Sequence, residues 1–309
     1  MAAAYAQVLR SLGVSFVVAS RGTASAAAFS KKWHVPAGSG PLKSQLAALP
    51  FQPKAAIVAV NTTSLAEAAS TLMEARIPRL LIEKPAGLDS ESVSALANQA
   101  QMAGTEAYVG YNRRFYASVE AARAMITADG GAISIKFDFT EARRRIEALN
   151  KDPAELGGWF YANSTHVIDL AFFLGGLPST LSAASWGGLS WHPSGAVFTG
   201  HGRTVDGCNY SYHANWLSPG RWGVEIMTPL RRLILQPIEQ LSVQGEAGFA
   251  THPVSLEYSL DRDYKPGIFL QTKAFLDGAS DPRLLTLAEH AKRIAVYDII
   301  RSGGTLRAS

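Results

Sequence analysis

The sequence predicts an α/β chain in which a doubly wound, mostly parallel sheet is followed by an α+β domain with a large, open, mainly antiparallel sheet. Two observations predict this. Up to about residue 112, short continuous apolar runs alternate with helical patterns, which is typical of parallel strands buried on both faces. Beyond that point, strand patterns alternate apolar and polar residues, as in a sheet with one face in water.

The elements of the first part follow one another in a regular order. Apolar residues at helical spacing predict a helix over residues 2–12, and Gly13 stands where a glycine often ends a helix. The β-branched run that follows predicts a strand over residues 14–19. The other predicted elements are helices over 23–32, 64–75 and 89–103, the last with Asp89 as its N-cap, and strands over 55–60, 79–82 and 107–110.

The second part begins with a predicted helix over residues 115–127. In residues 132–140, Ile133, Ile135, Phe137 and Phe139 alternate with polar residues and predict a strand with one wet face. Further strands are expected between residues 180 and 244, and helices over 267–276 and 286–301. The predicted domains are therefore 1–113 and 114–309, with the C-terminal helix able to pack back on the first domain.

Composition excludes several classes of protein. The net charge of +4 is spread along the chain, so nucleic acid is not expected as a partner. Cys208 is the only cysteine, which rules out an intrachain disulfide and any CxxC motif. No apolar run approaches the roughly 18 to 20 residues that span a bilayer, and no basic leader precedes an apolar segment. We therefore expect a cytoplasmic protein with no membrane partner.

A lysine stands at the end of one predicted parallel strand. Lys84 follows the run 79–82 and precedes Pro85, which restrains the lysine backbone to an extended conformation. Open α/β sheets bind ligands at the carboxyl ends of their strands, so this position suits a functional amine. A solvated lysine in a surface turn remains the alternative.

Three ordered motifs carry a family resemblance. They are Glu83-Lys84-Pro85, the run VGYNRRF over residues 109–115, and Gly157-Gly158 followed by the run HVIDL over residues 166–170. Together they resemble the signatures of the glucose-fructose oxidoreductase and inositol dehydrogenase family (Gfo/Idh/MocA). The resemblance covers essentially the whole chain, and it implies a Rossmann domain, a second domain built on a large open sheet, and an active site between the two.

The resemblance also implies catalytic roles. Lys84 would lie beside the nicotinamide and the reacting hydroxyl, with Glu83 also counted as cofactor-binding, and His166 would be the catalytic histidine. A lysine cation can stabilise the carbinol oxygen, and an imidazole can exchange its proton. For His166, a histidine of the hydrophobic core is the alternative.

Other positions are implied as substrate-binding. Asn112 and Arg113 would shape the pocket, and Asp169 lies one helical turn after the catalytic histidine, where a structural carboxylate is the alternative. The family often has an aspartate four residues before that histidine, but here Ala162 stands there. Asn163 is therefore expected to bind substrate instead.

The cofactor-binding residues are expected at two further strand ends. Ser20 and Arg21 follow the second strand of the expected Rossmann sheet, and no acidic residue stands there to bind a ribose 2′-hydroxyl. NADP is therefore the expected cofactor, with NAD as second choice, unless Arg21 is simply an exposed loop residue. Asn61 and Thr62 fit a loop that lines the cofactor, although such residues also begin helices.

The strand and GxGxxG loop that open a dinucleotide fold have no counterpart in this sequence. Met1 stands about where that loop would end, so the Rossmann sheet is expected to be incomplete. A misassigned start or truncated chain would explain this, and so would a true loss of dinucleotide binding.

The sequence thus predicts hydride transfer between NADP(H) or NAD(H) and a secondary hydroxyl of a sugar, sugar nucleotide or cyclitol. The alternative is a non-catalytic sugar-binding or scaffold protein. A small sugar-like substrate is the expected partner, and homo-oligomers could form through the open sheet. The histidines show no metal-binding spacing, so no metal is expected.

Overall fold

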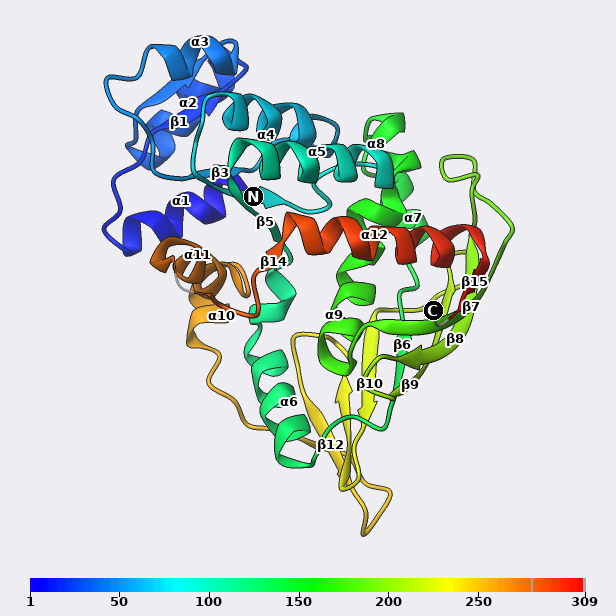
Figure 1. Ribbon diagram of the computed structural model, residues 1–309. Coiled ribbons are helices and arrows are strands. Elements are labelled where there is room, and N and C mark those ends of the chain that lie inside the picture. The colour runs from blue at the N-terminus through cyan, green and yellow to red at the C-terminus, as the bar shows by residue number, and fades with distance from the viewer. Residues whose placement is uncertain (279, 308–309) are drawn as a thin grey trace. The chain divides into compact units, whose positions relative to one another are not determined.

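The computed structural model describes residues 1–278 and 280–307, which fall into two compact units (Figure 1). The first unit comprises Met1–Asn112 and Leu260–Ala291, and the second comprises Arg113–Ser259 and Lys292–Ser309. The predicted continuous second domain, 114–309, differs from this division because the segment Leu260–Ala291 returns to the first unit. It does so by packing a helix on the first helix of the chain and pairing a strand with the first sheet.

The first unit holds a four-stranded sheet in the order β14-β5-β4-β3. Three of its strands are parallel, and β14 is antiparallel to β5. Their bounds are Ala56–Val58 for β3, Arg79–Glu83 for β4, Glu106–Gly110 for β5 and Leu285–Thr286 for β14. All three residues at the centre of β4, Leu80 to Ile82, are fully buried, as expected of a strand covered on both faces.

A separate parallel pair is formed by β1 (Val18–Ser20) and β2 (Ala37–Ser39). In the classic doubly wound order 3-2-1-4-5-6, the first strand lies between the strands that correspond here to β1 and β3. Among the described residues, no strand pairs with the outer edge of either one. Val17 and Val60, beside these edges, are 44% and 43% exposed. The parallel sheet is therefore incomplete, as the sequence predicts.

Helices pack around these strands. Those of the first unit are α1 (Ala2–Ser11), α2 (Thr23–Trp33), α3 (Leu42–Ala47), α4 (Leu65–Glu74), α5 (Ser90–Ala103), α10 (Ser259–Asp263, whose first residue is assigned to the second unit), α11 (Ile268–Asp277) and the short 3₁₀ turn η1 (Thr62–Ser64). Asp89 caps α5 as predicted, because its side chain accepts from the Ser92 amide at 2.7 Å. Gly104 ends that helix in the left-handed conformation.

A compact apolar cluster joins the two ends of the first unit. Tyr5 and Val8 of α1 pack with Leu81 of β4 and with Ile268 and Phe275 of α11. The burial of these side chains supplies the main driving force for holding α11 on the sheet.

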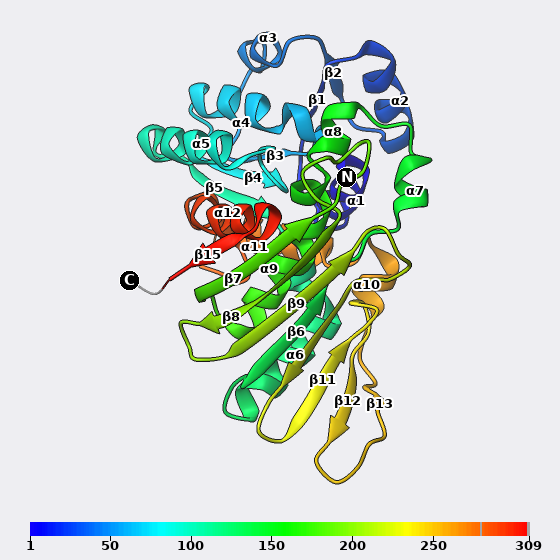
Figure 2. The same cartoon turned by 90° about the vertical axis from the view of Figure 1, so that its right-hand side faces the viewer.

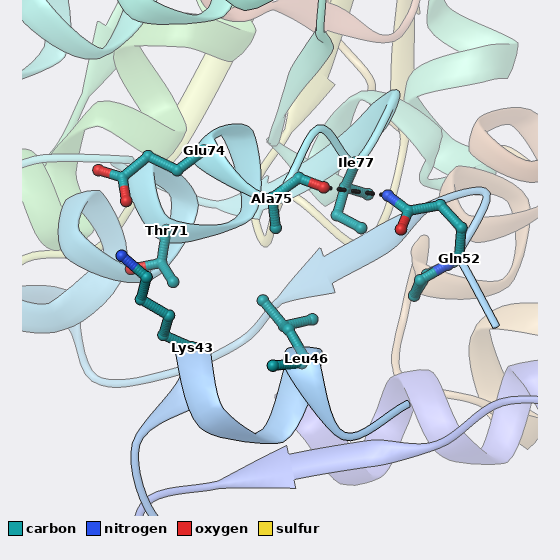
Figure 3. Close-up of a pocket in the computed structure, with 9 residues that line it drawn as sticks. Lys43, Leu46, Gln52, Thr71, Glu74, Ala75 and Ile77 are labelled. Atoms are coloured by element: carbon teal, nitrogen blue, oxygen red, sulfur yellow. Dashed lines mark hydrogen bonds between the residues drawn. The ribbon is translucent and has the colours of Figure 1, made fainter. Parts of the chain in front are cut away.

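A cavity of about 310 Å³ lies between α3 and α4 (Figure 3). Its lining residues are Lys43, Leu46, Ala47, Gln52, Pro53, Thr71, Glu74, Ala75 and Ile77. Gln52 Nε2 closes one side by donating to the Ala75 carbonyl at 3.0 Å. Since Ile77 precedes β4, this cavity lies at the amino end of that strand, away from the end that carries Lys84.

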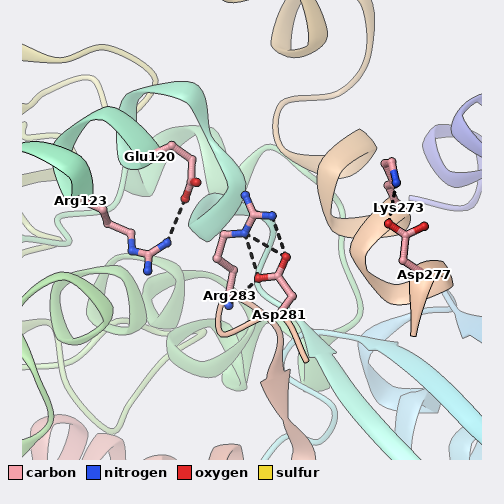
Figure 4. A network of polar contacts seen from close by, with 6 residues as sticks. All are labelled: Glu120, Arg123, Lys273, Asp277, Asp281 and Arg283. Atoms are coloured by element: carbon pink, nitrogen blue, oxygen red, sulfur yellow. Dashed lines mark hydrogen bonds and ion pairs between the residues drawn. The ribbon is translucent and has the colours of Figure 1, made fainter. Parts of the chain in front are cut away.

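The returning segment of the first unit carries two ion pairs drawn in Figure 4. Lys273 and Asp277 pair one turn apart on α11 at 2.5 Å. Asp281 accepts from Arg283 Nε at 3.0 Å and from Nη2 at 2.7 Å, which closes the turn before β14. Figure 4 also draws a pair of the second unit, Glu120 with Arg123, at 3.2 Å. The Lys273–Asp277 pair, with both side chains about half exposed, contributes little to stability.

The second unit is built on a nine-stranded sheet in the order β13-β12-β11-β10-β6-β9-β8-β7-β15. Every neighbouring pair is antiparallel except β6 with β9. The strands are β6 (Ser134–Asp138), β7 (Pro178–Trp186), β8 (Val197–Thr204), β9 (Asn209–Asn215), β10 (Gly223–Met227), β11 (Arg231–Leu235), β12 (Ser242–Gly245), β13 (His252–Pro253) and β15 (Gly304–Leu306). The predicted large, mainly antiparallel sheet is confirmed.

One face of this sheet carries the helices α6 and α9 (Figure 2). The helical elements of this part are η2 (Asn112–Phe115), α6 (Ala117–Ala128), α7 (Arg143–Glu147), α8 (Pro153–Gly157), the π-helical turn η3 (Phe160–Ser164), α9 (Thr165–Gly175) and α12 (Leu287–Ser302), through which the division between the units passes. The end of α9 packs very close to β6, because a Cβ on Gly175 would lie 1.8 Å from Ile135 Cδ1.

Alternation along the strands separates the two faces. In β9, Tyr210, Tyr212 and Ala214 are buried, whereas the residues between them are exposed. Phe137 of β6 stacks on Tyr212 with ring centroids 5.3 Å apart. Ile133, which the sequence pattern included in the strand, lies just before β6 and is 53% exposed. None of the described helices is long and apolar enough to cross a membrane.

Candidate active site

Predicted cofactor residues lie at the carboxyl ends of β1 and β3 in the first unit. Ser20 is the last residue of β1, and Arg21 follows it with an exposed side chain. Asn61 and Thr62 follow β3 at the start of η1. Arg21 Nη2 donates to Ser64 Oγ at 2.9 Å, so the two loops meet although their strands belong to separate sheets.

Lys84 directly follows β4 and is half-buried. The preceding Glu83 lies in the interior of the first unit, where Tyr5 donates its hydroxyl to Oε1 at 2.7 Å. Burial raises the pKa of Glu83, and the hydrogen bond from Tyr5 partly opposes this. The carboxyl of Glu83 therefore anchors the end of β4 to α1, which favours an indirect part in cofactor binding.

A second anchor lies on the other side of Lys84. The Lys84–Pro85 peptide is cis, and the Pro85 carbonyl accepts from Nε2 of His290 at 2.9 Å. The His290 side chain is fully buried, and its ring lies 5.5 Å from that of Tyr111. Sequence reasoning missed His290, because nothing in the helical pattern around it distinguishes it from a core residue. Lys84 is thus held between two buried contacts of the first unit.

Asn112 is also buried in the first unit. Its Nδ2 donates to the Pro266 carbonyl at 2.9 Å, which ties the end of β5 to the loop before α11. This contact occupies one donor of the amide and fixes its orientation. A substrate-binding role for Asn112 stays a prediction.

In the second unit, His166 is the second residue of α9 and is 5% exposed. Its ring lies 6.2 Å from that of Trp222. The same indole carries the guanidinium of Arg113 at 4.8 Å from its centroid. Trp222 therefore contacts two predicted site residues, His166 and Arg113.

A small cavity of about 190 Å³ adjoins this group. It is lined by Arg221, Trp222, Pro237, Ile238 and Glu239. The indole of Trp222 offers a stacking surface, Arg221 offers hydrogen-bond donors and Glu239 offers acceptors. This combination suits a hydroxylated ring.

Asp169 lies in a buried ion pair. Arg114 donates Nε to Oδ2 at 2.7 Å and Nη2 to Oδ1 at 2.6 Å, and both side chains are at most 2% exposed. Tyr297 donates to Oδ1 at 3.4 Å, and Arg293 lies 3.8 Å from the same oxygen. Both carboxylate oxygens are thus engaged inside the second unit. This arrangement favours the structural alternative for Asp169 over contact with substrate.

A buried carboxyl that sequence reasoning missed lies close to the start of α9. Glu141 accepts from Asn163 Nδ2 at 3.0 Å with both oxygens and from Ser164 Oγ at 2.9 Å with Oε1. Burial raises the pKa of Glu141 to about 7, although these hydrogen bonds and the charge of Arg113 oppose the shift. Asn163, predicted to bind substrate, is therefore first of all a partner of Glu141.

A bound metal ion needs several ligating side chains close together. Among residues 1–278 and 280–307, no three His, Cys, Asp or Glu side chains gather as a metal site would require.

Comparisons with known proteins relate the first part of the chain to a family of oxidoreductases. The model of the oxidoreductase family with an NAD-binding Rossmann fold, Gfo/Idh/MocA, matches residues 3–111. Residues 3–111 are accordingly similar to the NAD-binding Rossmann domain of the Gfo/Idh/MocA oxidoreductases. A comparison with curated protein sequences finds no match.

Solved structures of several oxidoreductases share the fold over nearly the whole chain. A putative NADPH-dependent oxidoreductase from Desulfitobacterium hafniense has a TM-score of 0.79 at 16% identity, and the match covers 99% of this chain and 94% of that one. UDP-N-acetylglucosamine 3-dehydrogenase from Acidithiobacillus ferrooxidans has a TM-score of 0.74 at 17% identity, covering 96% and 92%.

Levoglucosan dehydrogenase, in complex with NADH and levoglucosan, has a TM-score of 0.77 at 17% identity, covering 96% of this chain and 93% of that one. At these identities the likeness establishes the architecture, including the large sheet of the second unit, and leaves the substrate to be argued from the residues.

Proposed function

We propose that this chain carries out hydride transfer between a nicotinamide dinucleotide and a secondary hydroxyl of a sugar, sugar nucleotide or cyclitol. The observation that carries the proposal is the fixed position of Lys84 at the carboxyl end of β4, between the Glu83–Tyr5 and Pro85–His290 contacts. Similar structures support it, since one bears the name of a UDP-N-acetylglucosamine dehydrogenase and another holds NADH and levoglucosan.

Residues of the first unit fit the ribose and nicotinamide ends of such a cofactor. The exposed Arg21 guanidinium suits a ribose 2′-phosphate, and Asn61 and Thr62 add polar groups at the next strand end. NADP(H) is therefore the proposed preference over NAD(H). When bound, the nicotinamide accepts or supplies the hydride.

The side chains of the chain would handle the proton. Lys84, as an ammonium, would donate a hydrogen bond to the carbinol oxygen and stabilise the negative charge that develops there. His166 would take the hydroxyl proton during oxidation and return it during reduction. Arg113 and Trp222 would position the sugar ring, the indole by stacking and the guanidinium by hydrogen bonds. For Asp169 we propose a positioning role, through Arg114.

The test compares Lys84→Ala with Lys54→Ala, an exposed lysine just before the amino end of β3. Binding of NADPH and NADH is measured by nucleotide fluorescence, and oxidation of a panel of sugars and cyclitols is followed as NADPH or NADH formation. Loss of a group that acts on the reacting oxygen should lower kcat about 10²- to 10⁴-fold in Lys84→Ala, with Lys54→Ala unchanged. Equal rates for Lys84→Ala and the wild type would refute the assignment.

One observation favours a second function, non-catalytic binding of a sugar-like ligand. In the described residues β1 and β3, whose carboxyl ends carry the proposed cofactor residues, belong to separate sheets. The same titration separates the two functions. A chain that binds sugars but neither nucleotide at millimolar concentration would be a binding protein.

We also propose that two or more copies of the chain associate through the open face of the second-unit sheet. Light scattering after gel filtration gives the mass directly, and a monomer at all concentrations would exclude this association.

A further inference from the structure

Glu141 is a buried acid that the proposed chemistry leaves unassigned. It lies three residues beyond the end of β6, with 5% of the residue exposed. A carboxylate removed from water costs free energy unless partners compensate its charge, so a buried acid is retained where its contacts matter.

Its side-chain hydrogen bonds lead to one short turn. Both oxygens accept from Asn163 Nδ2 at 3.0 Å, and Oε1 also accepts from Ser164 Oγ at 2.9 Å. Asn163 and Ser164 are the last two residues of the π-helical turn η3, which runs directly into α9. Single π-helical turns occur often at functional sites, and here the turn ends two residues before His166.

The surroundings of Glu141 allow its carboxyl to change protonation state near neutral pH. Its hydrogen-bond donors are neutral, and within the described part of the chain it forms no salt bridge. Arg113 is the charged group that acts on it, and the indole of Trp159 also faces it. Uncompensated burial raises the pKa of the Glu141 carboxyl to about 7.

The same arginine links this carboxyl to the histidine. Arg113 stacks on Trp222, and the ring of His166 lies 6.2 Å from that of the same indole. Glu141 therefore reaches His166 by two routes: through the backbone of the turn that holds Asn163 and Ser164, and through the side chains of Arg113 and Trp222.

We propose that Glu141 is a positioning residue for His166, which holds the turn before α9 as a carboxylate and releases it on taking up a proton. The inference rests on the proposed function to the extent that His166 acts as acid and base. The step is a single protonation from water. A protonated carboxyl carries a hydrogen on one oxygen, so it can no longer accept from Asn163 Nδ2 with both.

The first arm of the test needs no turnover. The ¹³Cε1 resonance of His166, assigned by its absence in His166→Gln, is followed from pH 5.5 to 8.5 in the wild type, in Glu141→Gln, and in Glu246→Gln, an exposed control of the second unit. The wild type and the control should show an inflection near pH 7 that is absent in Glu141→Gln. An unchanged titration curve in Glu141→Gln would overturn the inference.

The second arm uses the pH profile of kcat/KM. If the carboxylate form is required, kcat/KM should fall about tenfold between pH 8 and pH 6 in the wild type, whereas Glu141→Gln should be low and flat over this window. Ser164→Ala serves as a second variant, in case Glu141→Gln does not fold. It removes one donor to the carboxylate, so the acidic limb should move to higher pH.

The outcomes distinguish the two proposals. A chain with no nicotinamide-dependent turnover but a Glu141-dependent titration of His166 would refute the proposed function and keep the inference. Turnover with the same acidic limb in the wild type and Glu141→Gln would keep the function and refute the inference.

Discussion

Replacing Glu141 with glutamine should change how the stability of the second unit depends on pH. The pKa of this carboxyl is raised by burial from 4.5 to about 7 in the folded chain. A raised folded pKa means that folding favours the protonated form. The folded state therefore carries almost no penalty from Glu141 below pH 4.5; the penalty grows as the pH rises from 4.5 to the folded pKa near 7 and is constant above it.

The magnitude follows from the two pKa values. Each pKa unit corresponds to roughly 1.36 kcal/mol, so ionised Glu141 costs the folded state about 3 kcal/mol at pH 8. Between pH 4 and pH 8 the wild type should lose about 3 kcal/mol of unfolding free energy that Glu141→Gln keeps, most of it above pH 5. Titration of the groups that do not interact with Glu141 is common to both proteins and cancels in the difference.

Urea unfolding followed by tryptophan fluorescence measures this difference. Five of the six tryptophans lie in the second unit, so the signal reports mainly on that unit. Unfolding free energies of the wild type and Glu141→Gln are compared at several pH values between 4 and 8. If the two proteins differ by the same amount at pH 5 and at pH 8, the carboxyl does not titrate as argued.

Three further predictions concern other contacts. Asp169→Asn breaks a buried, bidentate ion pair with Arg114 and should lower the urea-unfolding free energy by about 3–5 kcal/mol, whereas a loss below about 1 kcal/mol would mean that water reaches the pair. Arg21→Ala removes a guanidinium at the proposed 2′-phosphate position and should weaken NADPH binding at least about tenfold in a fluorescence titration. NADH binding should be unchanged, and an equal loss for both nucleotides would exclude 2′-phosphate recognition. Tyr5→Phe removes the hydroxyl that donates to buried Glu83 and should cost about 1–3 kcal/mol, measured from amide exchange in β4; exchange at the wild-type rate would contradict this.

Local patterns predicted much of the first unit. The run 79–82 predicted β4 within one residue, and Asp89 was identified as the cap of α5, because both signals depend on neighbours in the sequence. The strand β2 and the helix α3 were not predicted. β2 is three residues of alanine, glycine and serine, a composition with no apolar periodicity to detect.

The chemistry of the candidate site depends on contacts between distant residues. His290 meets the Pro85 carbonyl across 205 positions, and Glu141 meets Asn163 across 22, so neither partner can be predicted from local spacing. The three-residue spacing placed Asp169 on the helix face of His166, but it could not show that Arg114 would take both carboxylate oxygens. The motif resemblance identified Asp169 as a candidate site residue, but only the fold shows that its carboxylate is paired with Arg114.

The separation of β1 and β2 from the other parallel strands bears on how the first unit opens. No ladder of main-chain hydrogen bonds joins residues 18–48 to β3. The free energy of local unfolding should therefore be lower for residues 18–48 than for the sheet of β3, β4 and β5. The contact between Arg21 and Ser64 crosses that seam. A nucleotide that binds residues after both β1 and β3 would stabilise the contact between the two loops. Slower amide exchange within β2 would then report that the nucleotide is bound.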